Sequence, residues 1–298
     1  MTRLAGIELG GTKSIAVLAE GGSIIEQRTL STAAPAETLA QLNAVLREWQ
    51  EAGQLAALGI ASFGPVCLDP ASADYATMLD TPKPGWSEVT IGERLTAGLD
   101  CPWTIDTDVN AAALAEYGSG SAIGCDSLCY VTIGTGVGGG LVIGGRPVHG
   151  ALHPEIGHLR LRRASGDSFA GICRFHSDCI EGLVSGPALA ARFGAKGEAI
   201  ADDHPLWAHV AADLGELASS ILLATSAERI VFGGSVALGR QFLLPLIRRH
   251  VVAALGGYLP HVSSGTVADL IVLSLLDARA GPVGAIALAD QALRRAET

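Results

Sequence analysis

The chain lacks an excess of positive charge. Its 298 residues carry 20 Lys and Arg against 30 Asp and Glu, which gives a formal net charge of -10 at pH 7. A surface that binds nucleic acid or an anionic membrane needs clustered cationic side chains to neutralise phosphates. The charge balance therefore predicts that neither is a partner. A phosphate ligand stays compatible with it, because backbone N–H groups can bind an anion whatever the net charge.

The chain also lacks the long apolar segments of a signal peptide or a membrane span. Glu8 and the Gly10-Gly11 pair interrupt the first apolar run within a few residues. The longest uncharged run, residues 127–145, contains seven glycines and three Ser or Thr residues. That composition argues against a helix that faces lipid. We therefore expect a soluble, cytoplasmic protein.

Disorder and internal sequence repeats are absent too, although the architecture is expected to repeat. Hydrophobic residues make up 49% and charged residues 17% of the chain, which is enough for a core of one large or two ordinary domains. The periodicity predicts two α/β halves that each open on an antiparallel meander. In the first half it predicts strands at 4–9, 15–19, 23–30, 58–61 and 102–105, and helices at 35–51, 88–99 and 111–117. In the second half it predicts strands at 128–133, 141–143, 229–232 and 270–273, and helices from 185, at 206–227, from about 236 to 254 and at 281–295.

Two glycine turns, each following a predicted strand, are candidates for phosphate binding. Gly10-Gly11-Thr12 lies in the first half, and Gly134-Thr135-Gly136 lies at the equivalent place in the second. Such turns leave backbone N–H groups uncovered by side chains, as a phosphate requires at close approach. One turn alone is more typical of an ordinary hairpin, whereas two at matching positions favour a polyphosphate held from both sides of a cleft. Neither is a Walker loop or a GxGxxG that opens a helix.

Asp106 and Asp108 lie where a predicted strand meets a predicted helix. Aspartate is a favoured helix N-cap, so a cap is one interpretation of both residues. The other is a general base, because the N-terminus of a helix stabilises the carboxylate anion and keeps it able to accept a proton. Because the phosphate turns lie in the same chain, we favour the interpretation of Asp108 as a general base. Asn110 adds a hydrogen-bond donor and an acceptor on the next turn.

A two-histidine, two-cysteine set lies in an irregular polar segment. His158 precedes the pattern Cys173-x-x-His176-x-x-Cys179. In a cytosolic protein such a set is more typical of a metal site than of a disulfide framework, and its ligand types can close a tetrahedral structural zinc site. Chance placement of core residues is the alternative. The other cysteines lie in or beside apolar segments and are expected to be reduced core residues: Cys67, Cys101, Cys125 and Cys129.

The motifs, taken in order, resemble those of the ROK family of sugar kinases over nearly the whole chain. They are Glu8-Leu-Gly-Gly-Thr-Lys13, Asp106-Thr-Asp-Val-Asn-Ala-Ala112, Ile133-Gly-Thr-Gly-Val-Gly-Gly-Gly140, His153-Pro-Glu-Ile-Gly-His158, Cys179-Ile-Glu-Gly182 with Ser185-Gly-Pro187, and Phe232-Gly-Gly-Ser235. The segment Thr81-Pro-Lys-Pro-Gly-Trp86 and the Cys/His set resemble the family's zinc-containing fructokinase branch.

The resemblance implies a two-lobed, actin-like ATPase fold of the sugar kinase/Hsp70/actin type, with ATP and sugar in the interdomain cleft. The lobes are expected at 1–117, completed by the helix 282–298, and at 118–281. Implied cofactors are ATP, Mg²⁺ and a structural Zn²⁺, and a homodimer is the expected assembly. Some members carry an N-terminal DNA-binding extension, for which we expect no room before Glu8.

By motif position the resemblance also implies roles for single residues. Asp108 matches the base that takes the proton from the sugar hydroxyl. Sugar contacts are implied for Gly64, Pro65, Thr107, Asp108, Glu155, His158 and Glu181, and zinc ligands for His158, Cys173, His176 and Cys179. Nucleotide contacts are implied for Gly10, Gly11, Thr12, Lys13, Gly134, Thr135, Gly136, Pro187, Gly233, Gly234 and Ser235.

These expectations converge on an ATP-dependent hexose kinase, with fructose as the expected substrate and fructose 6-phosphate as the product. A kinase for mannose, glucose or an N-acylmannosamine is an alternative within the same class. A non-catalytic sugar sensor of the same fold is the alternative outside enzymes, and the retained Asp108 speaks against it, since a binder needs no base.

Overall fold

The computed structural model describes residues 2–297, without the side chain of Glu198, and the chain divides into two compact units. Unit 1 runs to Ala115 and includes Pro147–His153 and the C-terminal segment from Arg279. Unit 2 comprises Glu116–Arg146 and Pro154–Ala278. The sequence-based division had assigned 147–153 to the second lobe, whereas the structure places this short segment in unit 1.

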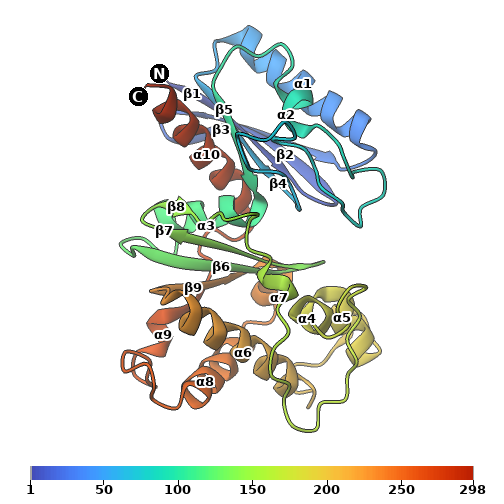
Figure 1. Ribbon diagram of the computed structural model, residues 1–298, viewed down its shortest axis with the longest axis vertical. Coiled ribbons are helices and arrows are strands. Elements are labelled where there is room, and N and C mark those ends of the chain that lie inside the picture. The colour runs from blue at the N-terminus through green and yellow to red at the C-terminus, as the bar shows by residue number, and fades with distance from the viewer. Residues whose placement is uncertain (1, 298) are drawn as a thin grey trace. The chain divides into compact units, whose positions relative to one another are not determined.

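Unit 1 is built on a five-stranded sheet in the order β3-β2-β1-β4-β5 (Figure 1). Its strands are β1 (Arg3–Leu9), β2 (Lys13–Glu20), β3 (Ser23–Ser31), β4 (Ala57–Ser62) and β5 (Trp103–Thr107). The first three strands form the antiparallel meander expected from the sequence, and β4 and β5 continue the sheet in parallel. All six residues of β4 are buried, as in a parallel strand covered on both faces.

The helices of unit 1 are α1 (Pro35–Ala52), α2 (Ile91–Thr96), the part of α3 (Asp108–Ser119) up to Ala115, and α10 (Ala280–Ala296). Helix α1 begins with proline and buries an apolar stripe that includes Leu39, Leu42, Leu46 and Trp49. Helix α10, drawn in red in Figure 1, packs on β1 and β4. The approach is close because Gly59 has no side chain, and a Cβ there would lie 2.0 Å from a carbonyl oxygen of α10.

Unit 2 repeats the same arrangement, with a five-stranded sheet in the order β10-β9-β6-β7-β8. The strands are β6 (Ser127–Ile133), β7 (Val137–Ile143), β8 (Arg146–Pro147), β9 (Arg229–Gly233) and β10 (Ile271–Leu273). Strands β6 and β7 are antiparallel, and β9 and β10 extend the sheet in parallel. The helices are α4 (Ile180–Val184), α5 (Gly186–Phe193), α6 (Trp207–Thr225), α7 (Gly234–Gly239), α8 (Leu243–Leu255) and α9 (Val267–Leu270). The sequence-based expectation of a repeated architecture is confirmed.

Two predicted helices differ from the observed ones. The helix expected at 88–99 is only the six-residue α2, because the chain before it forms the antiparallel bridges Val66↔Met78 and Thr77↔Thr90. The helix expected after β9 is split into α7 and α8, with the break following Gly239. Arg240, the residue after α7, has φ -127° and ψ 48°, so the backbone leaves the helical conformation there.

Within residues 2–297, no helix combines the length and the apolar character that crossing a membrane requires.

Candidate active site and metal-ligand cluster

The first glycine turn lies between β1 and β2 in unit 1. The Gly10 N–H donates to the carbonyl of Lys13 at 3.1 Å, and a Cβ at Gly10 would lie 2.6 Å from that oxygen. Among the described residues, nothing accepts a hydrogen bond from the N–H groups of Gly11 and Thr12, whose side-chain positions are exposed. The turn therefore offers two uncommitted donors, as a phosphate-binding turn must.

Glu8, at the end of β1, is a functional candidate that the sequence indicated only as part of a motif. Its Oε2 is buried and has no hydrogen-bond partner among the described residues. Burial, and after it the neighbouring carboxylate of Asp108, raise the pKa of Glu8 to about 7, against the opposing effect of Lys13. An unpaired, buried carboxylate oxygen beside a second carboxylate is a candidate ligand for a divalent cation.

Asp108 is the first residue of α3, but the cap of that helix is its neighbour. The Thr107 hydroxyl accepts the N–H of Asn110 at 3.2 Å, which is the usual N-cap to N3 hydrogen bond. The Asp108 Oδ1 accepts the N–H of the adjacent Val109 at 2.8 Å, which is not the hydrogen bond of an N-cap. The capping interpretation of Asp108 therefore loses its main support.

The sequence-based reason for keeping Asp108 ionised needs correction. Backbone N–H groups do lower the pKa of Asp108, as expected at a helix N-terminus, but desolvation outweighs them and raises it to about 6. The carboxylate is still mostly ionised at pH 7, and its proton affinity is higher than that of an exposed aspartate. A general base is most effective when its pKa lies near the operating pH.

Asp106 has a different role from Asp108. Its Oδ1 accepts the N–H of Thr107 and the side-chain amide of Asn110, both at 2.7 Å, and its Oδ2 contacts His149 Nε2 at 3.0 Å. The hydrogen bond that His149 donates to the Asp106 carboxylate raises the pKa of His149. Asp106 therefore braces the β5–α3 junction that carries Asp108, and His149 ties residues 147–153 to it. No pattern in the sequence indicated this role of His149.

The predicted sugar contacts Gly64 and Pro65 follow β4 in the same unit. The next N–H, that of Val66, donates to Nε2 of the buried His153 at 3.3 Å. A Cβ at Gly64 would lie 3.3 Å from the same imidazole. The two histidines of residues 147–153 thus hold two of the loops that carry predicted site residues in unit 1.

The second glycine turn, between β6 and β7 in unit 2, is held from both sides. The N–H of Gly186 at the start of α5 donates to the carbonyl of Gly134 at 2.7 Å. Glu181 Oε2 accepts the N–H of Val137 at 3.1 Å. The N–H groups of Thr135 and Gly136 meet no acceptor within the part of the chain that the structure describes. Glu181, predicted as a sugar contact, also supports this turn.

The other predicted nucleotide contacts of unit 2 gather around this turn. Gly233 to Ser235 follow β9, and Gly234 has φ +83°, a conformation that favours glycine. A Cβ at Gly234 would lie 2.5 Å from the carbonyl of Ile133, and one at Gly134 would lie 3.8 Å from Ser235 Oγ. Pro187 lies exposed in the first turn of α5.

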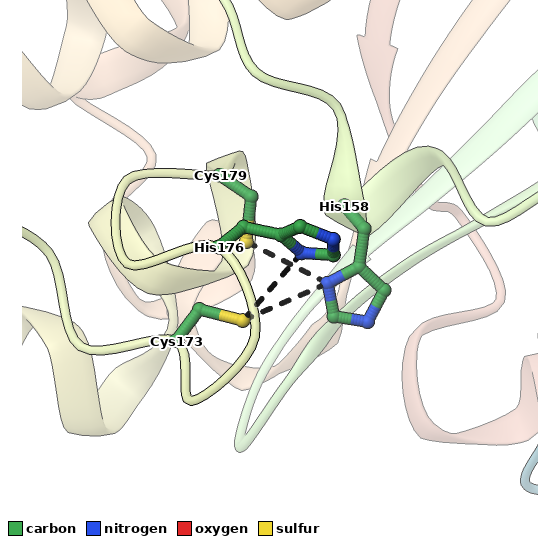
Figure 2. Close-up of side chains that lie close together, drawn as sticks. All are labelled: His158, Cys173, His176 and Cys179. Atoms are coloured by element: carbon green, nitrogen blue, oxygen red, sulfur yellow. Dashed lines mark hydrogen bonds between the residues drawn. The ribbon is translucent and has the colours of Figure 1, made fainter.

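The predicted metal ligands form a cluster (Figure 2). One ligand atom from each of His158, Cys173, His176 and Cys179 lies within 4.8 Å of the others. The Sγ atoms of Cys173 and Cys179 lie 3.9 Å and 3.5 Å from His158 Nδ1, and Cys173 Sγ lies 3.9 Å from His176 Nδ1. Ligands around a tetrahedral zinc are about 3.3–3.8 Å apart, so the cluster fits one such ion with little rearrangement.

The backbone places these ligands next to predicted sugar contacts. The His158 N–H donates to the carbonyl of Glu155 at 3.0 Å, and Glu155 itself is exposed. Cys179 immediately precedes α4, on which Glu181 lies. Burial raises the pKa of the Cys179 thiol to about 11, so a bound cation would be needed to favour its thiolate.

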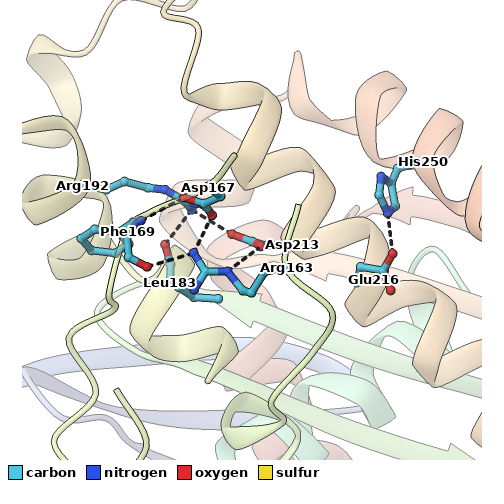
Figure 3. A network of polar contacts seen from close by, with 8 residues as sticks. All are labelled: Arg163, Asp167, Phe169, Leu183, Arg192, Asp213, Glu216 and His250. Carbon is cyan, nitrogen blue, oxygen red and sulfur yellow. Dashed lines mark hydrogen bonds and ion pairs between the residues drawn. The ribbon is translucent and has the colours of Figure 1, made fainter. Parts of the chain in front are cut away.

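A buried network of charges, which the sequence did not suggest, orders the rest of this loop (Figure 3). Arg163 and Arg192 both pair with Asp167, and Arg192 also contacts Asp213 of α6 at 2.8 Å. Arg192 additionally donates to the carbonyl of Leu183 in α4 at 3.3 Å. The network links the irregular segment before Cys173 to α4, α5 and α6. No local sequence pattern marks such a set, because its members come from separate segments.

Comparisons with known proteins agree with this geometry. The ROK family model matches residues 4–292. A fructokinase of Zymomonas mobilis is 37% identical, with 95% of each chain covered. One of Pediococcus pentosaceus is 35% identical, covering 98% of this chain and 99% of its own. The crystal structure of a ROK hexokinase from Thermus thermophilus superposes with a TM-score of 0.80 at 25% identity, covering 99% of this chain and 100% of its own.

The match spans nearly the whole length of the chain and of its relatives. The expected two-lobed, actin-like ATPase fold is therefore confirmed, with its two mixed sheets corresponding to units 1 and 2. The chain belongs to the ROK family.

Proposed function

We propose that the protein is an ATP-dependent fructokinase, which converts D-fructose and ATP to fructose 6-phosphate and ADP. The observation that carries the proposal is Asp108, a desolvated carboxylate with a pKa of about 6. Thr107, and not Asp108, caps the helix that begins here. The fructokinases with 35% and 37% identity to this chain support the choice of sugar.

Phosphoryl transfer requires alignment and charge neutralisation more than covalent chemistry, because its transition state is loose. Asp108 would accept the proton of the attacking sugar hydroxyl. Each unit has a glycine turn with two uncommitted N–H groups, Gly11 and Thr12 in one and Thr135 and Gly136 in the other, and these would bind phosphate oxygens. The remaining nucleotide contacts proposed are Gly10, Lys13, Gly134, Pro187, Gly233, Gly234 and Ser235.

The residues present fit the divalent cation that such a kinase uses with ATP. The unpartnered Oε2 of Glu8 would hold Mg²⁺, directly or through its water, and Asp108 would stay free to accept the sugar proton. When bound, the ion neutralises charge on the phosphate oxygens.

We assign the sugar to residues whose backbone or side chains are already held in place. They are Gly64, Pro65, Thr107, Glu155, His158 and Glu181. The Thr107 hydroxyl accepts the helix N–H and keeps its own proton for a sugar oxygen.

The Cys/His cluster is assigned to one structural zinc ion. Two thiolates and two imidazoles form a closed coordination shell with no position for water, so the metal would order the sugar loop without taking part in the reaction. A cytoplasmic location and a homodimeric assembly complete the proposal.

Coupled detection of ADP release over a panel of sugars tests the proposal. We expect kcat/KM to be highest for fructose among fructose, glucose, mannose and N-acetylmannosamine, in the presence of ATP and Mg²⁺. A clear preference for another hexose would replace fructose and leave the kinase class intact. Sugar binding without ADP release from any member would favour the sensor.

A further inference from the structure

Lys83 lies in a loop between β4 and α2 that is firmly held within unit 1. Trp86, three residues later, is fully buried, donates from Nε1 to the carbonyl of Ala33 at 3.3 Å, and contacts the ring of Phe63 edge-on at 5.1 Å. The Thr81 N–H donates to the Ser87 hydroxyl at 3.1 Å, which closes the base of the loop. The position of Lys83 is therefore defined by its surroundings.

The side chain of Lys83 extends to the first glycine turn, 72 residues earlier in the sequence. Its ammonium donates a hydrogen bond to the carbonyl of Gly11. This carbonyl can take only one of the three ammonium protons. Among residues 2–297, no carboxylate forms an ion pair with Lys83, so no anionic side chain neutralises its charge. Trp86 offers a further contact, with its ring centroid 5.9 Å from Nζ.

The chain has only three lysines, and two of them lie at this turn. Lys13 is the residue after Thr12, Lys83 reaches Gly11, and Lys196 is exposed in unit 2. The same neighbourhood contains the carboxylates of Glu8 and Asp108. A polyphosphate placed beside carboxylates is repelled unless cations offset their charge, and the two ammonium groups would supply positive charge in addition to the proposed Mg²⁺.

We propose that Lys83 is a phosphate-binding residue, whose ammonium binds the polyphosphate of the nucleotide together with the free N–H groups of Gly11 and Thr12. This inference rests on the proposed function, which places phosphate at that turn. The hydrogen bond to Gly11 aims the ammonium before the ligand arrives, so less side-chain entropy is lost on binding. The ligand class is a nucleoside di- or triphosphate.

The test compares Lys83→Met, Lys83→Arg and, as the matched control, Lys196→Met. Binding of ATP, ADP, inorganic pyrophosphate, adenosine and fructose 6-phosphate is measured by calorimetry on the full chain, beside the KM values for ATP and fructose. A charge-assisted hydrogen bond contributes enough that its loss weakens binding about 10- to 100-fold. We expect that loss for ATP, ADP and pyrophosphate in Lys83→Met, with adenosine affinity and fructose KM unchanged.

The other variants separate charge from shape. Lys83→Arg keeps the cation and should retain phosphate binding within about threefold, while Lys196→Met should match the wild type. Raising the salt concentration should weaken pyrophosphate binding less in Lys83→Met than in the wild type, because one ionic contact is missing. A merely structural lysine would instead lower thermal stability and affect adenosine and pyrophosphate alike.

The outcomes distinguish this inference from the function on which it rests. If the wild type phosphorylates sugars but Lys83→Met binds ATP and pyrophosphate as Lys196→Met does, the inference is wrong and the kinase stands. If Lys83→Met loses affinity for fructose 6-phosphate and not for ADP, the ammonium binds the product phosphate and the inference is wrong as stated. If the wild type binds neither ATP nor pyrophosphate, both fail.

Discussion

Two carboxylates in unit 1, Glu8 and Asp108, are held with pKa values of about 7 and 6, mainly by desolvation. Replacing the general base is expected to slow the chemical step and to leave sugar binding nearly unchanged. Asp108→Asn should lower kcat by about 100- to 10,000-fold, the usual contribution of a general base, while fructose still binds. The Thr107 cap does not depend on Asp108, so helix α3 should form normally.

Rapid-mix or coupled kinetics, with fructose binding measured separately, checks this expectation. Asp74→Asn serves as the control, because Asp74 is an exposed aspartate of the same unit outside the proposed site. A kcat for Asp108→Asn within a few-fold of the wild type would show that the residue is not the base.

The raised pKa of Asp108 also predicts two dependences on pH. The base must be deprotonated, so kcat/KM for fructose should fall as the pH decreases through about 6.

The stability of the fold should also depend on the ionisation of Asp108. Because its folded pKa lies above its unfolded value of about 4, the free energy of unfolding decreases as the pH rises from about 4 through 6, and the full loss is present above pH 6. Asp108→Asn should therefore unfold at a higher temperature than the wild type at pH 8, and not at pH 4. Thermal melts at both values measure this, and an equal shift at the two values would contradict it.

Among the elements, the charge network around Arg192 orders the loop before Cys173 and fastens it to α4, α5 and α6. Replacing Arg192 with Met should destabilise the protein by about 3–5 kcal/mol, because Asp167 and Asp213 would be left buried without that partner. Urea unfolding measures the change, with the exposed Arg294→Met as control.

We expect the charge network and the proposed zinc ion to stabilise the same loop by independent means. The Arg192→Met cost should therefore persist in protein treated with a chelator. If metal removal abolished the difference between this variant and the wild type, the network would depend on the metal and the prediction would be wrong.

For the whole molecule, metal content is the simplest property to measure. We expect one zinc per chain in protein purified without chelator, and less than about half in Cys173→Ala, because a tetrahedral site loses most of its affinity with a thiolate. Since His158 and Cys179 adjoin Glu155 and Glu181, the variant should raise the KM for the sugar more than that for ATP. Cys101→Ala is the control, as Cys101 lies outside the cluster. Elemental analysis that shows no zinc in the wild type, or equal zinc in both proteins, would exclude this site.

Both sheets follow one plan, a meander of three strands extended by parallel strands, although the two halves share no sequence repeat. The strands require alternating apolar residues, and the turn after the first strand requires glycines with their backbone freedom. Different sequences can meet both requirements. This is why the plan was predictable from periodicity, while the extent of single helices such as α2 was not. There, the bridge Thr77↔Thr90 and the burial of Trp86 determine where the helix begins.

The sequence by itself determined the features whose causes are local: the strands, the glycine turns between them, the Cys/His spacing and the order of motifs that indicated the family. Only the tertiary structure decided how Asp106 and Asp108 differ, since one is bonded to His149 and Asn110 and the other is left for chemistry. It also decided the pKa values of Glu8 and Asp108 and brought Lys83 to Gly11. Desolvation and charge neutralisation depend on segments far apart in the chain, and no local pattern records which of them meet.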